Sequence, residues 1–154
     1  LLNGVLIGSA VQFFAIPLFG IMSDRLGRRP LYLGGAAALA LFAYPFFVMV
    51  STQQPAVIYT AITVSLVIHA AMYAPQAAFF SELFGTDVRY SGASVGYQLA
   101  SPLAGGLAPI ICLPLLQWSG GAPWPVAGYL IAMAGITMLS VYLAAETHRM
   151  TLED

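Results

Sequence analysis

Two long apolar segments are joined by a short polar stretch, GIMSDRLGRR (residues 20–29), which carries four charged side chains. Charge is otherwise scarce, since 60% of the 154 residues are hydrophobic and 7% are charged. About 25% of the residues of an ordinary soluble domain are charged, and a water-soluble fold needs a polar surface that this chain lacks. Composition therefore excludes a soluble enzyme, a nucleic-acid-binding protein and a disordered tail, and it predicts a protein embedded in a bilayer.

The remaining charges form two more groups, at 82–89 and at 146–154, and no lysine occurs. The uncharged stretches 30–81 and 90–145 are each long enough for two membrane-spanning helices, which need about 20 apolar residues apiece. Together with residues 1–22, they predict an all-α integral membrane fold with five transmembrane helices. We place these spans at about 1–22, 31–50, 56–79, 92–117 and 124–145.

The arginines predict how the spans are oriented. All five lie at 23–30, at 80–91 or in the tail at 146–154, which are alternate connections and therefore share one side of the membrane. Basic residues accumulate on the cytoplasmic side, so we expect a multi-pass protein of the cell membrane with its C-terminus in the cytoplasm. Trp118 and Trp124 flank an uncharged turn on the other side, at the depth that indole rings prefer.

The start of the chain, its one cysteine and its net charge lead to further expectations about organisation and partners. The chain opens at Leu1 within an apolar segment that lacks the basic start of a signal peptide, so we expect a fragment without its N-terminal part. Cys112 has no second cysteine to pair with, and no cluster of Cys and His has metal-ligand spacing. We expect no metal and no other cofactor. A net charge of −1 creates no field that attracts nucleic acid.

Polar side chains are distributed unevenly among the spans. Spans 31–50 and 124–145 carry almost none, so we expect them to face lipid, whereas the other three carry several and are expected to line an aqueous path. The candidates for that path are Gln12, His69, Tyr73, Gln76, Tyr97 and Gln98.

His69 is the most informative of these candidates. It shares one helical face with Tyr73 and Gln76, at positions i, i+4 and i+7. An ionisable group within a span is a candidate functional residue, which here would bind a carboxylate or carry a proton. The alternative is a neutral histidine that is hydrogen-bonded to a neighbouring helix.

The first charged group resembles the loop signature of the major facilitator superfamily, G-x-x-x-D-R-x-G-R-R/K. The matching residues are Gly20, Asp24, Arg25, Gly27, Arg28 and Arg29. Gly20 would allow two helices to approach closely, Gly27 would permit a tight turn, and Asp24 would accept hydrogen bonds from arginine. The alternative is a merely solvated basic turn. The resemblance implies that residues 1–154 are an incomplete C-terminal half, equivalent to spans 8–12 of a twelve-helix carrier.

The second group narrows the resemblance. The run ELFGTDVRYSGASVGYQ (residues 82–98) is similar to the pattern E-L-F-x-x-x-V-R-Y-[ST]-G-x-x-x-G-Y-Q of the metabolite:proton symporter family, which contains proline/betaine and shikimate carriers. Position 85 departs from it, with Gly where the family often has Pro. We expect Glu82 and Arg89 to pair with each other or with residues 23–30, and Ser91 and Gly92 to cap the fourth span. Such contacts would form a cytoplasmic gate, unless they are exposed pairs of little energetic value.

The resemblance implies a bacterial inner-membrane protein that carries out secondary active transport of a small organic acid or a zwitterionic metabolite. Alternating access and proton symport are expected, with the coupling carboxylate in the missing N-terminal half, because no predicted span here contains Asp or Glu. The expected partners are therefore the metabolite, the lipid bilayer and that missing half, and not nucleic acid.

An intramembrane enzyme is disfavoured because no catalytic carboxylate lies at membrane depth. The remaining alternative is a carrier-derived sensor or binding protein without transport.

Overall fold

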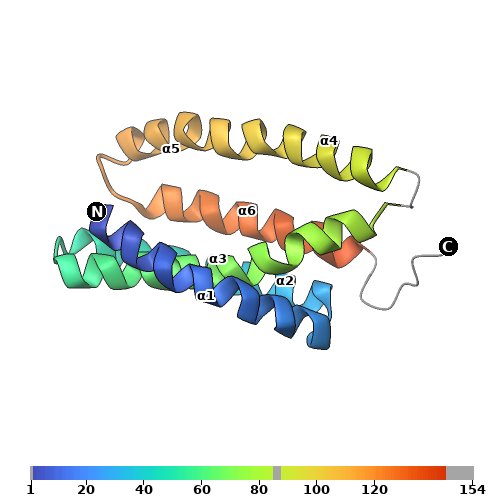
Figure 1. The fold of residues 1–154 in the computed structure, drawn as a ribbon. Helices are drawn as coiled ribbons and strands as arrows, with labels where there is room; N and C mark the ends of the chain where they lie inside the picture. Colours follow the sequence, from blue (N-terminus) through green and yellow to red (C-terminus); the bar gives the residue numbers. More distant parts are fainter. Residues whose placement is uncertain (1, 85–87, 145–154) are drawn as a thin grey trace.

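The computed structural model describes residues 2–84 and 88–144, and every regular element in these ranges is a helix (Figure 1). The helices are α1 (Leu2–Leu26), α2 (Arg28–Ser51), α3 (Pro55–Glu82), α4 (Arg89–Ser101), the π-helical turn η1 (Pro102–Gly106), α5 (Leu107–Trp118) and α6 (Trp124–Leu143). Four of them, α1, α2, α3 and α6, are long and apolar enough to cross a bilayer, and α5 is a shorter apolar helix. The predicted all-α membrane class is confirmed.

The predicted fourth span is a rod made of α4, η1 and α5, which follow one another without a break (Figure 1). The π-helical turn begins at Pro102 and ends at Gly106. Proline has no N–H for the usual i→i−4 hydrogen bond, and its ring clashes with the preceding turn, while the adjacent Gly105 and Gly106 have a low helix propensity. A wider turn accommodates these residues within a continuous helix.

The charged connections are shorter than expected. Helix α1 continues to Leu26 and α2 begins at Arg28, so Gly27 alone separates them. Likewise, α3 continues to Glu82 and α4 begins at Arg89. Hydropathy marks where the apolar part of a helix stops, but backbone hydrogen bonds continue into polar residues beyond that point. The expectation of an eight-residue loop at 23–30 is therefore wrong.

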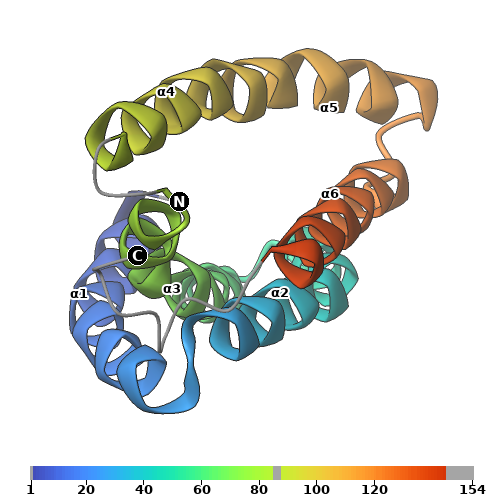
Figure 2. The same ribbon diagram turned by 90° about the vertical axis from the view of Figure 1, so that its right-hand side faces the viewer.

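Helix α3 is central to the packing. It contacts α1 on one side and α2 on the other, and α2 in turn packs against α6. In Figure 2 the rod runs along the top of the view, above α1, α2 and α3. Among the described residues, the rod contacts the other helices only where α4 meets α3 and where α5 meets α6. That α2 and α6 face lipid stays a prediction.

Small residues permit the close crossings with α3. A Cβ atom on Gly8 of α1 would lie 2.7 Å from the side chain of Leu66, and one on Gly35 of α2 would lie 2.6 Å from that of Met72. In membrane proteins such close approach replaces the hydrophobic effect as a source of packing energy. Gly20 does not have this role among the described residues, because nothing lies within 4 Å of the corresponding position.

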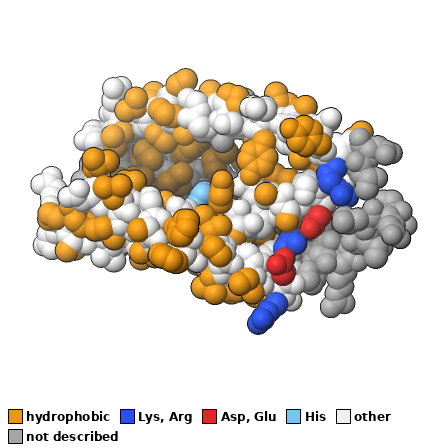
Figure 3. All heavy atoms as spheres, in the orientation of Figure 1, with side chains coloured by type: hydrophobic (Ala, Val, Ile, Leu, Met, Phe, Trp, Pro, Cys, Tyr) orange, Lys and Arg blue, Asp and Glu red, His pale blue; other side chains and the backbone are white. Residues whose placement is uncertain are grey.

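The surface is mostly apolar, and charge is confined to one end. Large apolar side chains such as Leu41 and Leu139 are exposed, as is suitable for contact with lipid. Figure 3 shows that the charged side chains on the visible face gather at one end of the molecule, and that the surface is hollowed between the rod and the other helices. A small buried cluster of Tyr32, Phe79 and Val141 joins α2, α3 and α6.

Candidate functional site

A charged cluster, defined here as Ser23, Asp24, Arg28 and Glu82, lies where three helices end or begin. Ser23 and Asp24 belong to the end of α1, Arg28 is the first residue of α2, and Glu82 is the last of α3. Gly27 reverses the chain between α1 and α2 with φ of 103°, a conformation that residues with a Cβ rarely adopt. The tight turn predicted at Gly27 is thus confirmed, and it brings Arg28 back beside Asp24.

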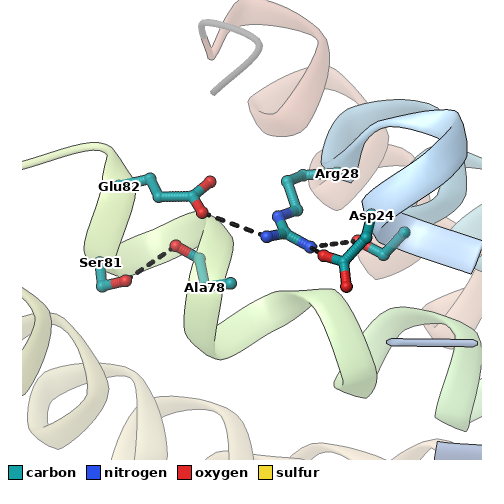
Figure 4. Close-up of polar contacts among 6 residues, drawn as sticks. Asp24, Arg28, Ala78, Ser81 and Glu82 are labelled. Atoms are coloured by element: carbon teal, nitrogen blue, oxygen red, sulfur yellow. Dashed lines mark hydrogen bonds and ion pairs between the residues drawn. The ribbon is translucent and has the colours of Figure 1, made fainter. Parts of the chain in front are cut away.

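Arg28 is the centre of the charged cluster (Figure 4). Its Nη1 donates to Ser23 Oγ at 3.1 Å and pairs with the Asp24 carboxylate, while its Nη2 lies 3.3 Å from Glu82 Oε1. The side chains of Arg28 and Glu82 are 16% and 20% exposed, against 64% for Asp24. The planar guanidinium therefore ties α1 and α2 to α3. Its contact with Glu82 is largely shielded from water, where breaking a pair costs more than at the surface.

The other two arginines of the first motif differ in their surroundings. Arg25 is exposed in the last turn of α1. Arg29 donates to the carbonyl oxygen of Tyr142, and its guanidinium lies 4.8 Å from the centre of the Tyr142 ring, so it connects α2 to α6. Sequence reasoning missed Tyr142, because it lies 113 residues away and no local pattern marks it.

The second motif makes one contact that was expected and two that were not. Glu82 pairs with Arg28 of the first motif, which is one of the two alternatives. Arg89 donates from Nε to the carbonyl oxygen of Phe84 at 3.4 Å. Gly92 lies against the Phe84 ring, because a Cβ there would be 2.5 Å from that ring.

The capping expected at the start of the fourth span is wrong. Helix α4 begins at Arg89 after Val88, which makes no side-chain capping hydrogen bond. Ser91 and Gly92 therefore lie inside the first turn, and the Gly92 N–H donates to the Val88 carbonyl at 2.7 Å. The helix starts three residues earlier than hydropathy indicates, so the residues expected to cap it are already helical.

Three of the expected pathway residues meet between α1 and α3. Gln12 Nε2 lies 3.1 Å from His69 Nδ1, and the His69 ring is stacked on Tyr73 with 5.6 Å between ring centres and 27° between planes. An amide nitrogen donates, so with the Gln12 amide placed in this orientation Nδ1 accepts, and the matching neutral tautomer carries its proton on Nε2. The hydrogen bond to a neighbouring helix is thus present, and His69 is nonetheless exposed.

The other expected pathway residues lie elsewhere. A cavity of about 620 Å³ separates the end of α3 from the start of α4, and we call it the α3–α4 cavity. Its lining residues are Ala77, Phe80, Ser81, Arg89, Tyr90, Ala93, Ser94, Tyr97 and Gln98. Tyr97 and Gln98 therefore belong to this cavity, and Gln76 is half-buried on α3. Among the described residues, no three of the types His, Cys, Asp and Glu lie together in a group that would hold a metal ion.

The profile of the Major Facilitator Superfamily matches residues 4–152. The chain belongs to this superfamily. The match covers both motifs and, apart from the first two residues of α1, all seven helical elements, so the resemblance predicted from the two motifs is confirmed.

Individual relatives in the superfamily are carriers of metabolites. The chain is 35% identical to the shikimate transporter of Escherichia coli K12 over 147 residues, which are 95% of this chain and 33% of that protein. It is 34% identical to the inner membrane metabolite transport protein YhjE of the same organism, over 89% of this chain and 31% of that protein. The E. coli K12 proline/betaine transporter is 30% identical over 94% of this chain and 29% of its own length. The chain thus spans about a third of these relatives, and no solved structure matches it.

Proposed function

We propose that this chain is part of a secondary active carrier for a small organic acid or zwitterionic metabolite. The support comes from the relatives, whose names include shikimate and proline/betaine. Shikimate, proline and betaine differ in shape and net charge, but each carries one carboxylate. A carboxylate on a small polar body is therefore the chemistry we propose for the cargo. Because the chain spans about a third of those relatives, the proposal concerns the whole protein, including the remaining helices.

The observation that carries the proposal is the charged cluster at one end of the helices. Alternating access requires each half of a carrier to move as a rigid body around a central site. Arg28 joins the ends of three helices through the shielded contact to Glu82 and the contacts to Ser23 and Asp24. We propose that this cluster makes the half rigid on the cytoplasmic side. The more exposed Asp24 is available to the opposing half, as one side of a gate that opens and closes.

The contact between Gln12 and His69 is the proposed cargo position in this half. With Nδ1 accepting from Gln12, the His69 Nε2–H is a donor for a cargo carboxylate, and Tyr73 supports the ring by stacking. A neutral donor suits a site that must bind and then release an anion. The predicted spans of this chain contain no Asp or Glu. We therefore propose that the proton-coupling carboxylate of the symporter lies in the other half.

The orientation is also proposed. The end with the charged cluster faces the cytoplasm of a bacterial inner membrane, following the distribution of arginine. The rings of Trp118 and Trp124 meet edge to face at the opposite end, with 5.7 Å between their centres. Interfacial indole rings of this kind suit the outer headgroup layer.

Transport by the full-length protein tests the proposal directly. Proteoliposomes containing it are given labelled shikimate, proline or glycine betaine, with and without an inward proton gradient. We expect uptake of at least one cargo to be faster with the gradient. A protonophore should reduce that uptake to the level measured without the gradient. Uptake that does not depend on the gradient would exclude proton symport. Binding of the three cargoes without transport would favour a sensor over a carrier.

A further inference from the structure

The α3–α4 cavity is a largely apolar region, with Arg89 and a few polar side chains in its lining, and it is distinct from the Gln12–His69 contact. It lies at the end of the molecule that holds the charged cluster, since Arg89 begins α4 and Ser81 is one residue before Glu82. Its volume of about 620 Å³ is within the range of small-molecule sites. Neither the charged cluster nor the proposed cargo position uses this cavity.

The lining of the cavity suits an anion with an apolar body. Among the residues that the structure describes, Arg89 is the one charged residue of the lining, and none of these lining residues is acidic. The bond to the Phe84 carbonyl uses the Arg89 Nε, so the two Nη atoms that form a bidentate pair with a carboxylate are not used by that bond. Ser94 adds a hydroxyl group, and the rings of Phe80 and Tyr97 meet edge to face at 6.0 Å to form an aromatic wall.

We propose that the α3–α4 cavity is a second carboxylate site, at the cytoplasmic mouth of the carrier, where Arg89 holds the cargo carboxylate. Ser94 donates a further hydrogen bond, and the Phe80–Tyr97 wall contacts the body of the cargo. Cargo leaving the central position then passes through a site of opposite charge before it reaches the cytoplasm. This assignment rests on the proposed transport function, since it takes its ligand class from the same cargo.

Protection from alkylation tests the site in the full-length protein. In a background without other cysteines, which includes Cys112→Ala, the reporter Ala93→Cys places a thiol in the cavity lining. The probe is shikimate and the reagent is N-ethylmaleimide. At a shikimate concentration about twice Kd, the alkylation rate should fall about threefold, because only the unoccupied fraction reacts.

Arg89→Gln should abolish this protection and Arg89→Lys should weaken it. Arg25→Gln, which removes the same charge outside the cavity, should preserve it.

A second variant separates a local site from a conformational effect of cargo bound elsewhere. His69→Ala removes the proposed donor at the central position and should leave the protection of Ala93→Cys intact. Protection that survives Arg89→Gln, or that disappears with His69→Ala, would overturn the second site. So would a lack of protection in a protein that transports shikimate. Protection that depends on Arg89 in a protein without any uptake would support the site and reject the transport function.

Discussion

At the scale of single residues, Arg28 is the side chain on which most of the charged end depends. Its guanidinium pairs with Asp24 and Glu82. Lysine cannot replace it with the same geometry, because an ammonium group lacks the planar fork that contacts two carboxylates. Both Arg28 and Glu82 are largely shielded from water. Removing Arg28 therefore takes one counter-charge away from the Glu82 carboxylate, which is in a poorly solvated position.

We predict that Arg28→Gln lowers the free energy of unfolding of the full-length protein by about 2 kcal/mol. The loss comes from Glu82, whose partly buried carboxylate loses its partner on α2. Denaturant unfolding in detergent, followed by tryptophan fluorescence, measures the change. The exposed Arg25 provides the matched control, since Arg25→Gln should change the unfolding free energy by less than about 0.5 kcal/mol. Equal effects of the two variants would show that the contact to Glu82 contributes nothing.

The hydrogen-bond pattern of His69 predicts which substitution preserves transport. In His69→Gln, the amide oxygen can accept from Gln12 and the amide nitrogen can donate to the cargo, as Nδ1 and Nε2 do in the native ring. His69→Ala loses both groups. We expect KM for uptake by the full-length protein to rise about tenfold in His69→Ala, and about threefold or less in His69→Gln. A similar KM in the alanine variant and the parent protein would exclude His69 from the cargo site.

At the scale of elements, the crossing of α1 on α3 depends on the absence of side chains. A Cβ on Gly8 would lie 2.7 Å from Leu66 and 3.4 Å from the backbone Cα of Thr63. Gly20 lies on the same helix, but nothing is within 4 Å of the corresponding position. The two glycines therefore differ in packing although they share a residue type and a helix.

This difference predicts opposite responses to substitution. Gly8→Val should destabilise the full-length protein by about 1–3 kcal/mol, because the added carbons force α1 away from α3. Gly20→Ala should be neutral or stabilise by up to about 1 kcal/mol, owing to the higher helix propensity of alanine. Thermal unfolding in detergent measures both variants. A large loss in Gly20→Ala would instead mean that Gly20 packs against a part of the protein outside the described residues.

At the scale of the whole molecule, the described helices have two chemically different ends. Asp24, Arg28 and Glu82 lie at one end, and the edge-to-face pair of Trp118 and Trp124 lies at the other. Between them the exposed surface is largely apolar (Figure 3). A molecule of this kind has one favourable depth in a bilayer, and the distribution of arginine is the basis on which we propose that the charged end faces the cytoplasm.

The orientation can be measured with single cysteines in a Cys112→Ala background of the full-length protein. We choose Arg25→Cys at the charged end and Gln117→Cys at the other, because both native side chains are exposed. In intact cells, a membrane-impermeant maleimide should label only Gln117→Cys, and in inside-out vesicles only Arg25→Cys. The reverse pattern would contradict a cytoplasmic charged end.

Much of the architecture was predictable because it depends on local composition. Uncharged stretches of sufficient length predict spans, and the glycine between Leu26 and Arg28 predicts the turn that the structure contains at Gly27. Helix ends were predicted less well, since backbone hydrogen bonding carries α1 and α3 beyond their apolar parts to Leu26 and Glu82. The roles of the glycines were not separable, because Gly8 and Gly20 look alike until their neighbours are placed.

The amino-acid sequence alone determined the membrane class and the family of this protein, since these depend on the solvation of each residue type and on motifs that are continuous in the chain. Only the tertiary structure decided that Arg28 pairs with Glu82, that Arg29 reaches Tyr142, and that Gln12 meets His69. These pairs lie 54, 113 and 57 residues apart. Which partner a side chain takes over such a separation depends on how the helices pack, and no local pattern encodes that.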